Sequence, residues 1–232
     1  MRFLKRLLGD SPPEDSASQT DAGGKIPFTE EEKEAHLSIA RYGDFLLTRA
    51  IRPSFDLQIT PRQGYRHDRF HDERVGTEIP VLMASASAER LFDLFLDLLD
   101  PLGEIVDCVL ETSHLHEVSG HTDLFRHGID LPVLKSTLYD FEDLLLNDGC
   151  TGIAVLNPAL SQEVQFDEHK LLIVYGRPLH AYERILRRYG VPRIDDLRFV
   201  SEAEHLHASR DEYIGIFERL QTELGVSDQV PT

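Results

Sequence analysis

The sequence contains one short pattern twice, Glu-x-x-His-Leu-His, and its histidines are the side chains whose type and spacing could do chemistry. These histidines are His114, His116, His205 and His207. In a strand, residues two apart point the same way and lie about 7 Å apart along the chain, so both imidazoles of a pair could bind one metal ion. Histidines that finish a strand with ordinary hydrogen bonds explain the pattern equally well, and no His-Glu-x-x-His or Cys-x-x-Cys spacing accompanies it. We therefore expect no tightly held metal and no cofactor.

Two runs of arginine stand out in a chain whose formal net charge is −17. A guanidinium group can bind a phosphate or a carboxylate through two parallel hydrogen bonds. The candidates for binding an anion or an acidic partner are Arg62, Arg66, Arg69, Arg184, Arg187 and Arg188. The first three lie in a polar segment, 62–77, that is predicted to be a long loop, and the last three share one face of a predicted helix. Many acidic residues lie nearby, so ion pairs within the fold are the alternative interpretation.

No residue is predicted to be catalytic. The chain lacks a recognisable nucleophile-base set, a phosphate-binding loop and a metalloprotease or kinase pattern. Its two cysteines, Cys108 and Cys150, exclude a disulfide framework and are interpreted as small hydrophobic residues.

The elements that must position these side chains follow from capping, turn and strand signals. Thr29 with Glu32 forms a capping box that predicts a helix over 29–50. The rest of the first half is predicted to contain strands at 55–60, 79–84 and 105–112 and helices at 87–100 and 132–147. The second half is predicted to contain strands at 152–157, 170–175 and 197–201 and helices at 179–189 and 209–224.

Both halves thus have the order β-β-α-β-α, and the match extends to the residues. Segment 81–116 aligns with segment 172–207 without a gap, at an offset of 91 positions in the sequence. This register predicts an internal duplication. The expected fold is α/β (α+β), a two-layer sandwich built from two pseudo-repeated β-β-α-β-α units, which either share one sheet or stand side by side. The expected domains are 1–28, 29–149 and 150–232.

The first nine residues form a basic amphipathic pattern, and a Ser-, Pro- and Gly-rich linker follows it. On a helix, the apolar face comprises Phe3, Leu4, Leu7 and Leu8, and the basic face comprises Arg2, Lys5 and Arg6. Segment 1–9 has the pattern of a helix that can dock on an anionic membrane or in a groove of a partner, and the alternatives are a short helix that packs on its own domain or a disordered start.

Composition narrows the class of function. The acidic charge argues against general nucleic-acid binding, and no apolar run reaches the ~20 residues of a transmembrane helix. We expect a soluble, cytoplasmic, non-enzymatic module that binds or regulates another protein. The alternative is a metal-dependent hydrolase that uses the two Glu-x-x-His-Leu-His segments.

Overall fold

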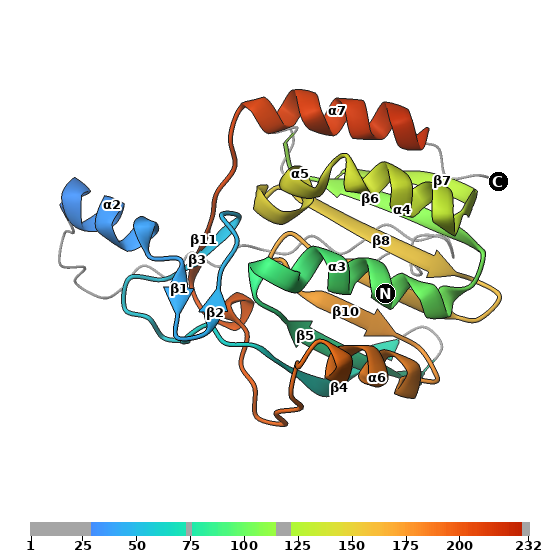
Figure 1. Ribbon diagram of the computed structural model, residues 1–232, viewed down its shortest axis with the longest axis horizontal. Coiled ribbons are helices and arrows are strands. Elements are labelled where there is room, and N and C mark those ends of the chain that lie inside the picture. The colour runs from blue at the N-terminus through green and yellow to red at the C-terminus, as the bar shows by residue number, and fades with distance from the viewer. Residues whose placement is uncertain (1–28, 73–75, 115–121, 229–232) are drawn as a thin grey trace.

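The computed structural model describes residues 29–72, 76–114 and 122–228, and its fold is mixed α+β. Its centre is a seven-stranded antiparallel sheet with the order β4-β5-β10-β9-β8-β6-β7 (Figure 1). The strands are β4 (Gly64–Asp72), β5 (Thr77–Ser85), β6 (Ile105–Thr112), β7 (Thr122–Asp130), β8 (Thr151–Asn157), β9 (Gln162–Phe166) and β10 (Leu172–Tyr175). Three strands from the second half of the chain therefore lie between β5 and β6 of the first half, so the two halves share one sheet.

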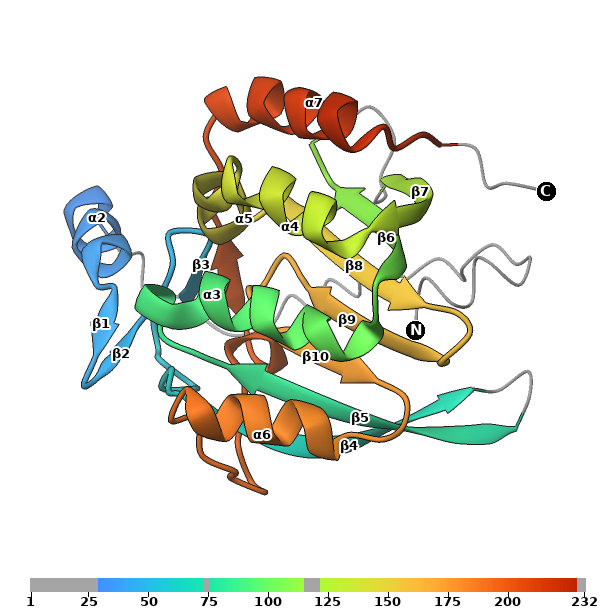
Figure 2. The same cartoon turned by 45° about the vertical axis from the view of Figure 1, so that its right-hand side comes forward.

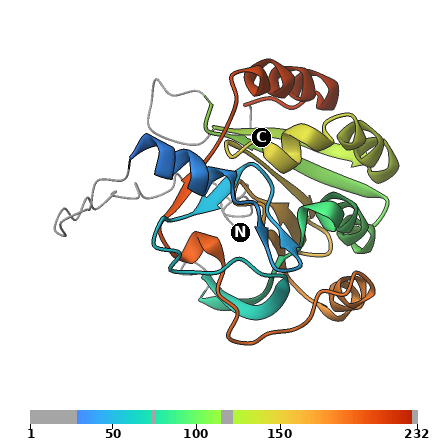
Figure 3. The ribbon, with the colours of Figure 1, turned by 60° about the vertical axis from the view of Figure 1, so that its left-hand side comes forward.

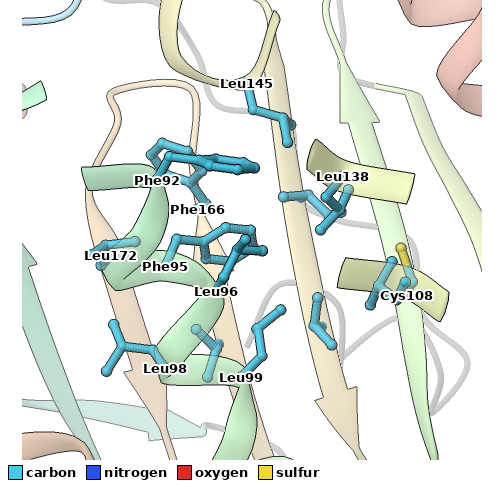
Figure 4. Close-up of a cluster of buried hydrophobic side chains, with 14 of the residues drawn as sticks. Phe92, Phe95, Leu96, Leu98, Leu99, Cys108, Leu138, Leu145, Phe166 and Leu172 are labelled. Carbon is cyan, nitrogen blue, oxygen red and sulfur yellow. The ribbon is translucent and has the colours of Figure 1, made fainter. Parts of the chain in front are cut away.

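Five helices gather on one face of this sheet (Figures 1 and 2). They are α3 (Ala88–Leu99), α4 (Leu131–Tyr139), α5 (Glu142–Asn147), α6 (His180–Arg188) and α7 (Glu212–Leu224). Helix α3 crosses the middle of the sheet, and apolar residues at helical spacing bury its inner face. Phe95 packs against Phe166 of β9 with ring centroids 5.1 Å apart (Figure 4). None of the described helices is long and apolar enough to cross a membrane.

Cys108 lies within this core, on β6, and is 1% exposed (Figure 4). Burial raises the pKa of its thiol to about 12, so the reactive thiolate is scarce in the folded protein. We expect a thiol reagent to modify the half-buried Cys150 in the native chain and both cysteines only after unfolding. A native Cys150→Ser variant that still reacts rapidly would contradict this expectation.

A smaller layer lies at one end of the sheet, where β8 begins and β9 ends (Figure 3). It contains α2 (Glu30–Ser38), the hairpin of β1 (Arg41–Tyr42) and β2 (Phe45–Leu46), and the antiparallel pair of β3 (Ile51–Pro53) and β11 (His205–His207). Strand β11 carries one of the two His-x-His pairs, so this layer positions it.

Several predicted elements were wrong. The capping box of Thr29 and Glu32 is confirmed, but its helix ends at Ser38 rather than near 50. The predicted loop 62–77 contains β4 instead. This strand lies at an edge of the sheet, where polar side chains reach solvent, so its sequence lacks the apolar pattern of a buried strand. The predicted strand at 55–60 is absent, and 197–201 overlaps a 3₁₀ turn at Val200–Glu202.

The pseudo-repeated two-layer sandwich is not confirmed. In the 91-residue register, β5 corresponds to β10 and α3 to α6, and β5 and β10 are neighbours in the sheet. The correspondence then ends, because β6 belongs to the sheet, whereas the matching residues, 196–203, contain the 3₁₀ turn and no strand. The expected boundary at 149/150 falls between strands of one continuous sheet.

Candidate metal centre

Three imidazoles converge at the end of the sheet that faces β11. His169, His205 and His207 each place one ring nitrogen within 4.8 Å of a nitrogen of the other two. Their ring centroids are 4.8–5.0 Å apart. His169 comes from the turn between β9 and β10, and the other two come from β11. The cluster thus joins segments far apart in the sequence.

A tight turn positions His169. The backbone N–H of Asp167 donates to the carbonyl of Leu171 at 3.2 Å, and Lys170 adopts a left-handed backbone with φ of 61°. The carboxylate of Asp167 has two roles: Oδ1 accepts from the N–H of Leu171 at 2.8 Å, and Oδ2 lies 3.0 Å from Nδ1 of His169. The bond to Nδ1 orients the ring, so Nε2 is the nitrogen that remains available.

Backbone carbonyls position the other two rings. Nδ1 of His205 lies 2.7 Å from the carbonyl oxygen of Ala203, and Nδ1 of His207 lies 2.7 Å from that of Gly149. A side chain at Gly149 would block this approach, because its Cβ would lie 2.5 Å from the carbonyl oxygen of Ala50. Glycine thus lets the turn before β8 lie against β11.

These carbonyl contacts fix the tautomers of His205 and His207. A carbonyl oxygen only accepts, so both Nδ1 atoms carry a hydrogen. In the neutral rings, both Nε2 atoms then present lone pairs, and these two atoms are 3.1 Å apart. Facing lone pairs at this distance repel each other unless a proton or a metal cation lies between them.

The charges around the cluster also favour a cation. Burial lowers the pKa of His169, but the carboxylates of Asp167 and Glu168 outweigh burial, and the net shift is upward. Burial is the largest cause that lowers the pKa of His207, and the neighbouring His169 and His205 lower it further. The site therefore disfavours several protonated imidazoles at once, while its acidic neighbours stabilise one positive charge.

A second cluster lies close by and contains His114, Asp148 and Cys150. Asp148 is fully buried and accepts hydrogen bonds from Nε2 of His114 at 2.7 Å, from the N–H of Cys150 at 3.2 Å and from the hydroxyl of Thr151. Its carboxylate is thus occupied by protein donors. We interpret this cluster as a structural clamp on the turn before β8.

Lys170 connects the two clusters. It is 5% exposed, and its Nζ donates to the carbonyl of Thr151 at 2.7 Å and lies 5.4 Å from the centre of the Phe166 ring. Burial lowers its pKa to about 8, although Asp148 and other acidic neighbours oppose that shift. A lysine in this setting fixes the β9–β10 turn to β8, and thereby the position of His169.

The four histidines singled out in the sequence do not form one cluster in the described structure. His205 and His207 lie together, His114 belongs to the neighbouring cluster, and His116 lies outside the described residues. Sequence reasoning missed His169, which lies outside both His-x-His pairs and which the β9–β10 turn brings to them. The available signal was Asp167 two residues earlier, a spacing that lets a carboxylate hold an imidazole.

Three of the six candidate arginines pair with acidic side chains of the same chain. Arg66 contacts both carboxylate oxygens of Glu202, at 2.9 and 3.0 Å. Arg69 pairs with Glu78 at 2.6 Å, and Arg188 pairs with Asp97 at 2.9 Å. The other three have no acidic side-chain partner among the described residues. Nε of Arg187 donates to the backbone carbonyl of Glu183 at 3.3 Å, and Arg184 is exposed. Arg62 lines a cavity.

Comparison of the chain with protein-family models, curated proteins and solved structures finds no match in any of the three.

Proposed function

We propose that the protein is a metal-dependent hydrolase whose metal ion is bound by His169, His205 and His207. One observation carries the proposal: Nε2 of His205 and Nε2 of His207 lie 3.1 Å apart while both Nδ1 atoms are committed to carbonyls. Zinc binds imidazole nitrogen at about 2.0–2.1 Å, so two ligands in a tetrahedral site are about 3.4 Å apart. A small rotation of either ring meets this geometry.

The contacts behind the imidazoles support the same proposal. Ligating histidines usually donate their second ring nitrogen to a carboxylate or a carbonyl, which fixes the tautomer and the ring orientation. Asp167 supplies the carboxylate for His169, and backbone carbonyls serve His205 and His207. All three rings are thus oriented by the fold before any ion binds.

Three protein ligands favour catalysis over a purely structural role. A structural zinc site normally has four protein ligands, whereas a catalytic site has three and leaves a position for water. A metal ion held by the three histidines would supply a bound water whose pKa is lowered to about 7, which is a nucleophile at neutral pH. In hydrolysis the oxygen of that water would bond to the acyl carbon, the bond to the leaving group would break, and the leaving group would take the proton that the water lost.

The proposed three-histidine centre departs from the sequence-based expectation of no tightly held metal, and the metal analysis below decides between them. That expectation rested on two histidines in each half, and His169 supplies the third ligand. The other sequence-based interpretation, a cytoplasmic protein-binding or regulatory module with docking through 1–9, stays a prediction, because 1–28 lies outside the described residues. Descent from an internal duplication also stays a prediction.

Metal analysis of the untagged protein tests the proposal. After loading with zinc and removal of free metal, we expect about one ion per chain in the wild type. We expect the ion to be lost in His169→Ala and in His205→Ala. His180→Ala is the matched control, because His180 is an exposed histidine on α6, and it should keep the ion.

Hydrolysis of an activated ester such as p-nitrophenyl acetate gives the second measurement. We expect zinc-dependent hydrolysis in the wild type and in the control, and none above background in the two ligand variants. Equal zinc in all four proteins would overturn the metal site. Zinc bound without hydrolysis of this ester or of a panel of amides and phosphate esters would overturn the hydrolase and leave the metal site.

A further inference from the structure

A cavity adjoins the histidine cluster, and His169 forms part of its wall. The empty space between its walls, counted together with the solvent at its open mouth, is about 460 Å³. The wall comes from the β2–β3 segment, residues 61–62 and 85–86, α3, the β9–β10 turn and residues 198–201. Most of the lining is apolar, and its buried members include Phe45, Ile51, Leu91 and Phe199.

The side chain of Thr48, in this apolar wall, has no hydrogen-bond partner among the residues that the structure describes. Thr48 lines the cavity and is 4% exposed, and its hydroxyl oxygen is buried without a hydrogen-bond partner. A buried hydroxyl left unpaired costs about 1–3 kcal/mol. The backbone at Thr48 is held in place, because the buried guanidinium of Arg52 donates to the carbonyls of Thr48 and Ile51. Because the hydroxyl oxygen is covered, a ligand atom reaches it only when the Thr48 side chain rotates toward the cavity, and the hydrogen bond then recovers that cost.

Two arginines, Arg62 and Arg198, also line this mostly apolar cavity. Both are exposed, and neither makes a side-chain ion pair with the residues that the structure describes. Arg198 is close enough to Glu202 to lower the pKa of that carboxyl group. Both carboxylate oxygens of Glu202, however, accept hydrogen bonds from Arg66. On a chain of net charge −17, two uncommitted guanidinium groups beside an apolar cavity favour a small anion over a neutral ligand.

We propose that this cavity binds a small carboxylate whose apolar body carries one hydrogen-bonding group. The apolar body lies against Phe45, Leu91 and Phe199, and the hydrogen-bonding group reaches Thr48. The carboxylate binds Arg62 and Arg198. An aromatic hydroxy acid such as para-hydroxybenzoate has this combination of groups. The free acid is the form that the two arginines recognise, so its role as the released product of a hydrolysed ester or amide rests on the proposed hydrolase, whereas binding itself needs no metal.

Calorimetric titration of the full chain with three probes tests this inference. The probes are para-hydroxybenzoate, benzoate, which lacks the hydroxyl, and para-hydroxybenzyl alcohol, which lacks the carboxylate. In the wild type we expect saturable binding, tightest for para-hydroxybenzoate. Thr48→Val, which keeps the side-chain shape, should weaken para-hydroxybenzoate about tenfold and change benzoate less than about twofold.

The arginine variants address the carboxylate. Arg62→Ala combined with Arg198→Ala should weaken both acids about tenfold or more and leave the alcohol nearly unchanged. Arg184→Ala, an exposed arginine on α6, is the matched control and should bind like the wild type. Circular dichroism establishes that each variant is folded. Absence of saturable binding, or equal binding by all variants, would overturn the inference.

Titration of His205→Ala separates the two proposals. We expect this variant to lose zinc and to bind para-hydroxybenzoate like the wild type. Carboxylate binding in a chain that never binds zinc would overturn the hydrolase alone. A zinc-loaded wild type that binds none of the three probes would overturn the cavity ligand alone.

Discussion

Zinc at 100 times its dissociation constant for the proposed centre should stabilise the folded protein by about 2.7 kcal/mol, because the three imidazoles converge only in the native chain. For a chain of 232 residues, this stabilisation raises Tm by roughly 5–11 °C. The imidazoles of His169, His205 and His207 are already oriented, so little conformational entropy opposes binding. A thermal melt with and without zinc measures the effect.

The combined change of His205→Ala and His207→Ala should abolish the zinc-dependent rise in Tm. It should have a small effect on the protein without zinc, because removal of both rings also removes the contact between their Nε2 atoms. His180→Ala should melt like the wild type with and without zinc. A zinc-dependent rise of wild-type size in the double variant would show that zinc stabilises the fold from another site.

Part of the second half of the sheet was predictable because its signals are local, although β9 was not predicted and the predicted strand at 197–201 is absent. The predicted strands at 152–157 and 170–175 overlap β8 and β10, and the predicted helix at 179–189 overlaps α6. Turns with glycine or proline bound these apolar runs, and such signals act over a few residues. Strand order depends on long-range pairing, which no local pattern encodes. The placement of β8, β9 and β10 between β5 and β6 therefore could not be predicted.

The candidate metal centre was half predictable for the same reason. A His-x-His pair is visible in the sequence, because its two side chains share one face of a strand. The third imidazole, His169, comes from a turn about 36 residues earlier, and only the folded sheet brings it to β11. The sequence-based alternative treated both His-x-His pairs as metal ligands. That was misleading, since His114 hydrogen-bonds to Asp148 and does not point at His205.

Asp148→Ala should lower the free energy of unfolding by about 3–5 kcal/mol, the usual result of removing one partner of a buried charged network. Asp148 is fully buried, and its loss leaves Nε2 of His114, the hydroxyl of Thr151 and the N–H of Cys150 without their acceptor. Denaturant unfolding measures the change. Asp196→Ala, at an exposed position, is the control and should stay within about 0.5 kcal/mol of the wild type.

Acid titration of stability gives this prediction a second readout. Burial alone would raise the pKa of Asp148. Hydrogen bonds from His114, Ser209 and Thr151 lower this pKa by more than burial raises it, so the net shift is downward. A carboxyl whose pKa is lower in the folded state stabilises the fold above its unfolded pKa of about 3.9, and this contribution disappears as the pH falls through the folded value. The gap in stability between the wild type and Asp148→Asn should therefore shrink as the pH falls below about 4.

Asp148→Asn should also weaken zinc binding at the proposed metal centre, because the backbone links the two. The carbonyl of Gly149 holds Nδ1 of His207, and Asp148 clamps the turn that contains Gly149. Asp148→Asn keeps the side-chain volume but replaces one acceptor oxygen with a donor, so it faces the donors of His114 and Thr151 with an N–H group. We expect the folded variant to bind zinc more weakly than the wild type, whereas Asp196→Ala should bind it equally. If Asp148→Asn is clearly destabilised but binds zinc as tightly as the wild type, then Asp148 does not position the metal centre and this prediction is wrong.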